Sequence, residues 1–487
     1  MSNAVTRYFN DQVMTRKMNS PIGILAFSFS ALVFAYATVF IGYQFGPALV
    51  IALAGLIFIL VCIKNPLVGF YLMATISLFT FYVGRFLSYD LHISSLLEIL
   101  IFAIFIGALL QQKKSAEEKS SFYKSPPTIA MLVYFVFVLI EGFNPNMYSM
   151  VGWLFYVRRF MEFLMVYYLG YKLFDDMHKV RNFIKFWLIL ALLNALYTCK
   201  QQWLGLSQFE ITWLNQDPHL VALYFQGGVI RKFSFLSDPA ANGVWMASMA
   251  AFSLVLAIWE TNFKRKIILI VSMILMVLAM SYSGTRTASV VFIGGVVFYI
   301  CMTINLKSSF FFLVFFAMLF LFLVWVPTEN ATIYRFQTAF RVSDEESLQV
   351  RDINRKSVQP YIYSHPFGGG LATSSQEGMR YNPGHYLAGF PSDSGFLKSA
   401  IETGWIGLAI ALLYFFSILY QGVTGFFKAK NKEIRVYIIA ISAAIVIFIL
   451  AQYSQVSIGQ FPALFFFYPC TALLTRLLKI DRELLSK

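Results

Sequence analysis

The chain has 487 residues, of which 59% are hydrophobic and 13% charged, and its formal net charge is +14. An ordinary soluble domain is about one-quarter charged, so this composition excludes a soluble globular protein and indicates a membrane protein. The Lys and Arg residues gather between apolar runs, which is typical of cytoplasmic loops beside anionic lipid and argues against nucleic-acid binding.

Apolar runs long enough to cross a bilayer follow one another from Pro21 to the C-terminus. We expect about fourteen helical spans, at residues 21–41, 46–63, 68–83, 92–110, 127–142, 151–171, 184–204, 240–259, 267–283, 287–304, 309–327, 394–421, 436–454 and 459–477. The first run is followed at once by further spans, so we do not expect a cleaved signal peptide. The fold class predicted is an all-α polytopic membrane protein.

The basic residues set the expected topology. With the N-terminus inside, every predicted inner loop is basic, so both termini are expected in the cytoplasm. The expected organisation is a cytoplasmic segment (1–20), a transmembrane bundle of about 11 helices (21–327) with an outer loop at 205–239, a large extracytoplasmic loop (328–393), C-terminal transmembrane helices (394–477) and a cytoplasmic tail (478–487).

The large loop is expected to be partly helical. Ser343-Asp344-Glu345-Glu346 reads as a capping box that begins a helix. Pro360 is expected to kink or end that helix, and the glycine run 368–370 is expected to turn the chain back. Loops of this length usually have a function or a structure of their own.

Several positive residues on the predicted outer side run against the topology rule. They are Arg85, Arg231, Lys232, Arg286, Arg335, Arg341, Arg351, Arg355, Lys356 and Arg380. A polyanionic ligand would explain them, because the planar fork of a guanidinium group matches phosphate oxygens. The alternative is solvated loop charge, or pairing with Asp344, Glu345, Glu346 and Asp352, and this alternative is favoured for Arg335, Arg341 and Arg380.

Four charged residues fall inside predicted spans: Glu98, Arg158, Arg159 and Glu162. Charge within a membrane is costly enough to suggest a function, here support beneath the phosphates of a substrate. A structural ion pair that links helices is an equal alternative.

Three outer segments together resemble the O-antigen ligase and polysaccharide polymerase superfamily, over residues 150–475. The first begins at Arg231 and runs through Asn242 into a span, and the second is the turn Ser283-Gly284-Thr285-Arg286. The third runs from Arg351 through the glycine run to Glu402-Thr403-Gly404-Trp405-Ile406-Gly407, which is its most specific part. Ligases of this family usually carry His-Asn where this chain has Asp393-Ser394, so the resemblance leans toward the polymerase side.

The resemblance implies a bacterial inner-membrane glycosyltransferase that polymerises polyprenyl-pyrophosphate-linked oligosaccharides on the extracytoplasmic side into O-antigen, capsule or exopolysaccharide. Membrane lipids and chain-length regulators or export proteins are expected partners. Ligase-type transfer to a lipid or protein acceptor is the alternative within the class. A flippase is the alternative from another class, although no repeat relates the two halves of the chain and both long loops lie on the outer side.

The chemistry needs groups that hold pyrophosphate and a base that deprotonates the acceptor hydroxyl. Arg231, Arg286, Arg351 and Arg355 are the candidates for pyrophosphate. Asp393 is the first candidate base, with helix capping as its alternative role, and His385 is the second candidate. The sequence contains no recognisable metal-binding or nucleotide-binding motif, so the predicted mechanism uses no metal and no cofactor.

Overall fold

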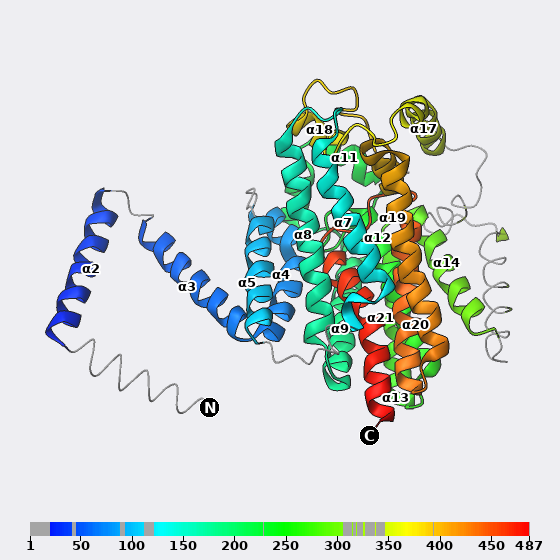
Figure 1. Ribbon diagram of the computed structural model, residues 1–487, viewed down its shortest axis with the longest axis horizontal. Coiled ribbons are helices and arrows are strands. Elements are labelled where there is room, and N and C mark those ends of the chain that lie inside the picture. The colour runs from blue at the N-terminus through cyan, green and yellow to red at the C-terminus, as the bar shows by residue number, and fades with distance from the viewer. Residues whose placement is uncertain are drawn as a thin grey trace. The chain divides into compact units, whose positions relative to one another are not determined.

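The computed structural model describes residues 20–40, 45–87, 93–111, 121–226, 228–304, 346–392 and 394–486, with single residues at 314, 318, 325, 326 and 337. Within these residues the regular structure is helical apart from one two-stranded hairpin (Figure 1). The chain divides into two compact units, Met1–Lys64 and Asn65–Lys487. In the first unit, the described helices are α2 (Pro21–Phe40) and α3 (Phe45–Lys64).

The second unit holds the remaining helices. They are α4 (Pro66–Leu87), α5 (Ile93–Leu110), α7 (Pro126–Ile140) with the 3-10 turn η2 (Glu141–Phe143), α8 (Met150–Leu173), α9 (Met177–Trp203), α10 (Gln208–Leu214), α11 (Pro218–Tyr224), α12 (Pro239–Trp259), α13 (Phe263–Tyr282), α14 (Arg286–Met302), α17 (Glu346–Ser364), α18 (Ser375–Tyr381), α19 (Gly395–Lys428), α20 (Lys432–Ala451) and α21 (Ala463–Leu485). The hairpin strands are β1 (Phe225–Gln226) and β2 (Val229–Ile230). They pair antiparallel, with Phe225 opposite Ile230.

The helices coincide with the predicted spans, except that 309–327 lies outside the described residues apart from four positions. Among the described residues, seven helices are long and apolar enough to cross a membrane: α4, α7 with η2, α9, α12, α19, α20 and α21. Parts of α3 and α5, and all of α14, form shorter apolar helices. The chain is therefore a helical membrane protein, and the number of about fourteen crossings stays a prediction.

Three helices form the core of the second unit. In α12, α20 and α21, between 83% and 89% of the apolar stretch is buried inside the protein. A helix that is apolar on all sides packs on all sides, and α12 accordingly contacts α13, α14 and α20. Ser248 donates a hydrogen bond to the carbonyl oxygen of Ala444 (3.1 Å), and such small residues let α12 and α20 approach closely.

Several helices extend beyond the apolar runs that predicted them. α13 begins at Phe263, where the side chain of Asn262 accepts a hydrogen bond from the amide of Arg265. α21 continues to Leu485 through most of the segment predicted as a tail. Hydropathy detects only the part of a helix that lies in hydrocarbon, so polar helix ends are missed.

Both long loops carry structure of their own. Segment 205–239 contains α10, α11 and the hairpin, and it has a small core of Leu214, Tyr224 and Phe233. The large loop contains α17 and α18, which agrees with the prediction that it is partly helical. In Figure 1, α11, α17 and α18 lie at the top of the second unit, and we call this the loop end.

Of the two effects expected of Pro360 on the helix of the large loop, ending the helix is wrong, and a kink stays a prediction. Helix α17 passes through Pro360 and ends at Ser364. A proline removes one backbone hydrogen bond, and this one stands near the helix end, where Ser364 donates from its hydroxyl to the carbonyl oxygens of Pro360 and Tyr361. The predicted capping residues 343–345 lie outside the described residues.

Candidate functional site

Helix α19 is interrupted near its start, and the interruption receives the glycine run of the large loop. Gly404 has φ 65° and ψ −174° within the helix, a conformation that favours glycine. The amide of Gly369 donates to the carbonyl oxygen of Ile401 at 2.9 Å. One residue further, the amide of Gly370 donates to the carbonyl oxygen of Glu402, also at 2.9 Å. The break thus supplies acceptors for the loop.

The two backbones approach so closely that side chains are excluded. A Cβ atom on Gly404 would lie 1.9 Å from the carbonyl oxygen of Pro366. A Cβ atom on Gly368, whose φ is +70°, would lie 2.5 Å from the amide nitrogen of Gly404. The spacing of glycines in both segments therefore has a steric cause, which is the docking of the loop on the broken helix.

A charged network reinforces this docking. The carboxylate of Glu402 is 1% exposed and accepts hydrogen bonds from the amide (3.2 Å) and hydroxyl (2.6 Å) of Ser374. Lys398, one turn earlier on α19, pairs with Glu377 of α18. Arg159 of α8 lies 3.7 Å from the second oxygen of Glu377. The network connects α8, α18 and α19, so it fixes the loop over the bundle.

Arg231 lies beside the turn that precedes α14. Its Nε donates to the carbonyl oxygen of Ser283 at 3.1 Å, and its Nη2 donates to the hydroxyl of Thr285 at 3.0 Å. Thr285 in turn donates to the carbonyl oxygen of Pro239 at 3.0 Å, at the start of α12. Two segments singled out in the sequence are thereby joined through one guanidinium group.

Arg286 follows Thr285 and is the first residue of α14. The positive charge of Arg351 on α17 acts on the guanidinium group of Arg286. Arg355, one turn further along α17, points to the connection between α20 and α21. There it donates to the hydroxyl (2.7 Å) and carbonyl oxygen (3.2 Å) of Tyr453, and it lies 3.7 Å from Asp352. The structure thus joins Arg231 to the turn that ends at Arg286, and the charge of Arg351 acts on Arg286, with Arg355 one turn further along α17.

Arg85, one of the positive residues on the predicted outer side, is bound by backbone carbonyl groups of the protein itself. Its side chain is buried at the end of α4 and donates to the carbonyl oxygens of Ser234 (2.8 Å), Leu236 and Ser237 (3.3 Å). The guanidinium group also lies 4.4 Å from the ring centroid of Phe233. Arg85 therefore holds the segment that carries Arg231, and its predicted outer location does not require an anionic ligand.

The charges within the spans separate into two groups. Arg158 forms an ion pair with Glu98 at 3.2 Å, which links α8 to α5. Glu162 lies within the electrostatic field of Glu98, Arg158 and Arg159. Arg159 turns to the loop end, where its Nη2 also donates to the carbonyl oxygen of Gly459 at 3.2 Å. A helix-linking ion pair accounts for Glu98 and Arg158, and Arg159 connects the bundle to the loop.

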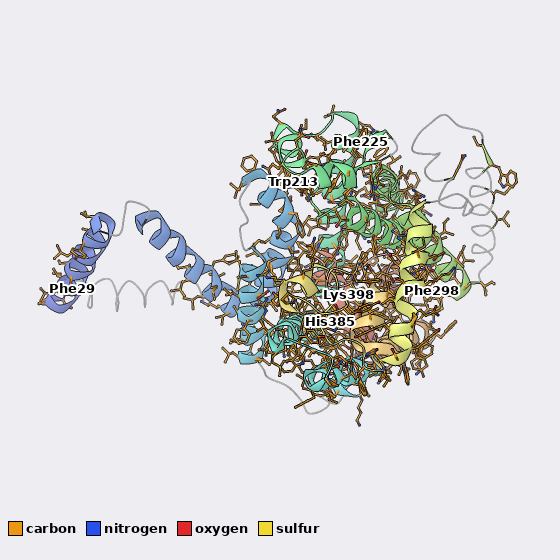
Figure 2. All side chains as sticks on the ribbon, turned by 90° about the horizontal axis from the view of Figure 1, so that it is seen from above. Phe29, Trp213, Phe225, Phe298, His385 and Lys398 are labelled. Atoms are coloured by element: carbon orange, nitrogen blue, oxygen red, sulfur yellow. The ribbon has the colours of Figure 1, made fainter. Side chains whose placement is uncertain are left out.

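His385 is packed inside the large loop. Its Nδ1 accepts a hydrogen bond from the amide of Leu387 at 3.1 Å, and its ring meets Tyr148 edge to face at 4.9 Å. Burial lowers the pKa of its imidazole, which opposes protonation. Figure 2 shows it near Lys398, over the middle of the second unit, with Trp213 and Phe225 over another part. Its role as a base stays a prediction.

Asp393 lies outside the described residues, and its role as the base stays a prediction. The capping role considered for it belongs to Ser394, which is the N-cap of α19. The hydroxyl of Ser394 accepts from the amide of Leu397 at 3.3 Å and donates to the carbonyl oxygen of Gln452 at 3.0 Å. Asp393 thus immediately precedes the cap residue.

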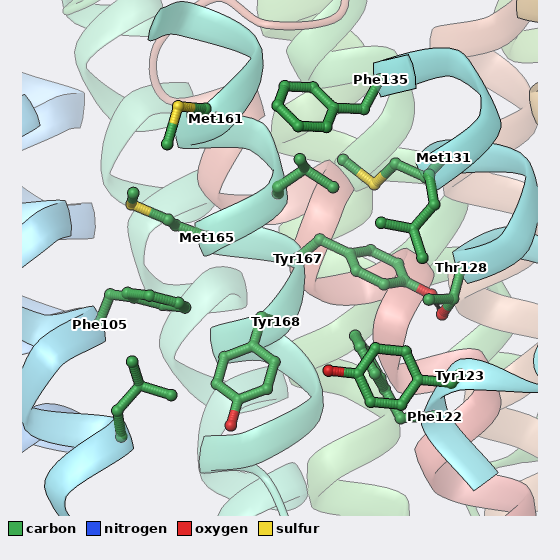
Figure 3. A pocket seen from close by; sticks show the side chains of 13 residues that line it. Phe105, Phe122, Tyr123, Thr128, Met131, Phe135, Met161, Met165, Tyr167 and Tyr168 are labelled. Atoms are coloured by element: carbon green, nitrogen blue, oxygen red, sulfur yellow. Dashed lines mark hydrogen bonds between the residues drawn. The ribbon is translucent and has the colours of Figure 1, made fainter. Parts of the chain in front are cut away.

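The described part of the second unit contains cavities, of which two lie near the elements discussed above. One of about 110 Å³ lies below the start of α19 and is lined by Lys398, Ser399, Gln452 and the tyrosines Tyr134, Tyr156, Tyr414 and Tyr468, among others. A larger one of about 700 Å³ is lined by α5, α7, α8 and the turn before α7 (Figure 3). Its wall is largely Met and aromatic side chains, and Thr128 and Tyr167 satisfy each other by a hydrogen bond of 2.7 Å. This second cavity suits an apolar chain.

Among the described residues, no group of three or more His, Cys, Asp or Glu side chains is placed to hold a metal ion.

Comparison with known proteins adds one match. Residues 271–412 match the family model described as O-antigen ligase. The matched part of the chain therefore supports its resemblance to the O-antigen ligase and polysaccharide polymerase superfamily. The match runs from α13 to α19, so it contains the glycine run, the broken helix, Arg286 and Arg351. Members of this family are membrane enzymes of glycan transfer in surface polysaccharide biosynthesis. No curated protein matches the chain.

The sequence analysis named Glu402 as part of a motif, but it gave no role to the residues that fasten the large loop. Lys398 and Glu402 both fall inside the predicted span 394–421 and, like Glu98, could have been noticed as charges within a membrane. Glu377 and Ser374 gave no such signal, because their partners are distant in the sequence.

Proposed function

We propose that this protein joins polyprenyl-pyrophosphate-linked oligosaccharide repeat units into a surface polysaccharide, on the extracytoplasmic side of the bacterial inner membrane. The proposal rests on the family match together with one observation at the loop end, the connection of Arg231 to the turn that ends at Arg286 and the action of the charge of Arg351 on Arg286. The basic loops of the sequence support a cytoplasmic location for both termini and an outer location for this end.

Arg286 and Arg351 carry like charges that act on each other, so an anion bound between them would lower the electrostatic free energy of both groups. A pyrophosphate between them offsets this like-charge interaction with charge-assisted hydrogen bonds. Arg231 supports the same region, since it holds the turn that ends at Arg286. An anion of high charge is therefore the ligand that this arrangement favours.

In the proposed reaction, an acceptor sugar hydroxyl attacks the anomeric carbon that carries the pyrophosphate. A new glycosidic C–O bond forms, the bond from carbon to pyrophosphate oxygen breaks, and the hydroxyl proton passes to a base. The polyprenyl pyrophosphate leaves with the negative charge that develops in the transition state. Guanidinium groups aimed at this charge stabilise the transition state more than the ground state, and no metal ion is needed for that task.

Asp393 is the first candidate for the base, and His385 the second. Asp393 precedes the N-cap of α19, where the amide dipoles of a helix start favour an anionic carboxylate. His385 has Nδ1 engaged by Leu387, which leaves Nε2 as the nitrogen that would have to accept a proton.

Polymerisation is favoured over ligation by one feature of the sequence. The family's ligases usually carry His-Asn ahead of the Glu-x-Gly-x-x-Gly helix, whereas this chain has Asp393-Ser394. Ligase-type transfer to a lipid or protein acceptor therefore remains the second candidate. The apolar cavity between α5 and α8 offers space for a lipid chain in either case.

The test uses purified protein and the polyprenyl-pyrophosphate-linked repeat unit, without nucleotide and without divalent metal. A polymerase converts the units into a ladder and releases carrier pyrophosphate. A ligase is silent until its separate acceptor is added, and a flippase leaves the units unchanged. An unchanged substrate under both conditions would overturn the proposed glycosyl transfer.

The same assay separates the two candidate bases. Asp393→Asn removes the negative charge and keeps the size of the side chain, so we expect most activity to be lost while the fold is preserved. Full activity of Asp393→Asn would exclude Asp393 as the base and make His385→Gln the next variant to measure.

A further inference from the structure

The loop end exposes a group of aromatic rings that the proposed chemistry does not use. Tyr386, Tyr363 and Tyr148 are 72%, 70% and 67% exposed. Tyr361 stacks on Tyr386, with ring centroids 5.5 Å apart and ring planes at 21°. It stacks also on His365, at 4.0 Å and 12°. We call these three rings, together with Tyr148 and with Tyr363 two residues further along α17, the aromatic platform.

The platform is held by rigid surroundings. Tyr361 packs against the small core of Val358, Leu387 and Ile401, which joins α17 to the start of α19. The amide of Tyr148 donates to the side chain of Asn382 at 3.2 Å. The rings are therefore held in place before any ligand arrives, although three of them are largely open to solvent.

The same helix carries the platform and part of the cationic site. Tyr361 follows Arg351 on α17 by roughly 15 Å along the axis, at about 1.5 Å of rise per residue. A glycan whose pyrophosphate lies at Arg351 could extend along α17 to these rings. The geometry joins a site for the charged end of a substrate to a surface for its sugar chain.

We infer that the aromatic platform binds the carbohydrate chain of the lipid-linked substrate, several sugars away from its pyrophosphate. This inference rests on the proposed function and names the part of the substrate that this surface would recognise. Sugar rings present C–H groups on their flat faces, and these meet the negative π face of a tyrosine ring.

The composition of the platform favours a glycan over a lipid surface. Its rings carry hydroxyl or imidazole groups, and Gln359 donates to the hydroxyl of Tyr363 at 2.6 Å, so polar groups stand at the edges of the ring faces. Tyrosine offers a large contact area at a low cost in conformational entropy, which suits a weak and repeated contact with a polymer. Polar edges around flat faces match the hydroxyl groups around a sugar ring.

The experiment measures binding of carrier-free glycan to the full-length protein in detergent. The probe is the surface polysaccharide of cells that express the protein, cut by partial hydrolysis and separated by size. The variants are Tyr386→Ala, which removes the most exposed ring, and Tyr386→Phe, which keeps the ring and loses the hydroxyl. Tyr420→Ala is the matched control, because Tyr420 is 50% exposed on α19, away from the platform.

We expect the unmodified protein to bind long fractions better than short ones. Tyr386→Ala should weaken binding of the long fractions at least tenfold, Tyr386→Phe should stay within about threefold, and Tyr420→Ala should have no effect, since stacking depends on the ring face. Equal binding by Tyr386→Ala and the unmodified protein would overturn the inference. So would an unmodified protein that binds no fraction, or a Tyr386→Ala variant that loses only its insertion into lipid vesicles.

A second readout separates this inference from the proposed function. In the polymerisation assay, Tyr386→Ala should shorten the product ladder by a larger factor than it lowers the initial rate of carrier release from single repeat units, because a single repeat unit offers less glycan for the platform to bind. If no variant releases carrier, the proposed reaction is wrong, and the binding measurement still decides whether the platform holds glycan.

Discussion

The repulsion between Arg286 and Arg351 leads to a prediction in which stability and ligand binding change in opposite directions. Arg351→Ala removes one of two like charges that lie in each other's field. Arg351 is partly exposed, so the relief is on the order of 1 kcal/mol or less. Without ligand, the variant should therefore be as stable as the unmodified protein or slightly more stable.

With pyrophosphate bound, the unmodified protein should be more stable than Arg351→Ala. A charge-assisted hydrogen bond contributes about 1.5–3 kcal/mol, so Arg351→Ala should weaken pyrophosphate binding roughly 10- to 150-fold. At a pyrophosphate concentration about 100 times the dissociation constant, the unmodified protein gains about 2.7 kcal/mol of stability. A variant that binds about 100-fold more weakly gains only about 0.4 kcal/mol.

The assay is thermal unfolding of the purified protein in detergent, with and without inorganic pyrophosphate. Arg380→Ala is the control, because Arg380 belongs to the same loop but is exposed and lies over the ring of Tyr381 at 5.3 Å. A full pyrophosphate shift in Arg351→Ala would refute the anion site, as would an equal loss in Arg380→Ala. A ligand-free Arg351→Ala protein that is less stable by several kcal/mol would show that Arg351 is structural.

Three further predictions use matched variants. Gly404→Ala should destabilise the protein by more than about 3 kcal/mol in thermal unfolding, whereas Gly384→Ala, with a positive φ but no atom within 4 Å of a Cβ, should cost about 1 kcal/mol. Arg159→Ala should make the large loop more sensitive to protease and Arg158→Ala should not, because only the first of these two arginines contacts Glu377. His385 is held neutral by burial, so stability should fall as the pH drops below its unfolded pKa of about 6.5, and His385→Gln should flatten that fall; an unchanged pH profile would contradict this.

The helices were the part of the fold most open to prediction. An apolar run of about 20 residues leaves the chain few alternatives in a bilayer, because every backbone polar group must be satisfied within the segment. Helix ends were less predictable, as the early start of α13 at Phe263 and the late end of α21 at Leu485 illustrate. These ends consist of polar residues that hydropathy does not distinguish from loops.

The candidate residues that could be predicted were those that depart from the rule that positive charge lies on the cytoplasmic side of a membrane. Arg231, Arg286 and Arg351 stood out as positive charges on the predicted outer side, and in the structure Arg231 contacts the turn that ends at Arg286 while the charge of Arg351 acts on Arg286. The same rule also selected Arg85, which instead holds a loop by its carbonyl oxygens. Charge alone cannot distinguish these roles, because the difference depends on which backbone folds against the guanidinium group.

Pairings between distant residues were beyond prediction from one sequence. Both Asp393 and Ser394 are good helix caps by type, and the contact of Ser394 with Gln452, far along the chain, accompanies the cap that forms. Similarly, Glu377 has no feature that identifies Lys398 as its partner. Such choices are made by tertiary packing.

The docking of the glycine run into the broken helix constrains how this protein can be re-engineered. Because the amides at 369 and 370 use acceptors that exist only where α19 is interrupted, the loop and the start of α19 cannot be exchanged separately between relatives. A chimera intended to change sugar preference should have its junctions before α17 and after Gly407. Junctions at the apparent loop boundary near Ser394 would separate the donors from their acceptors.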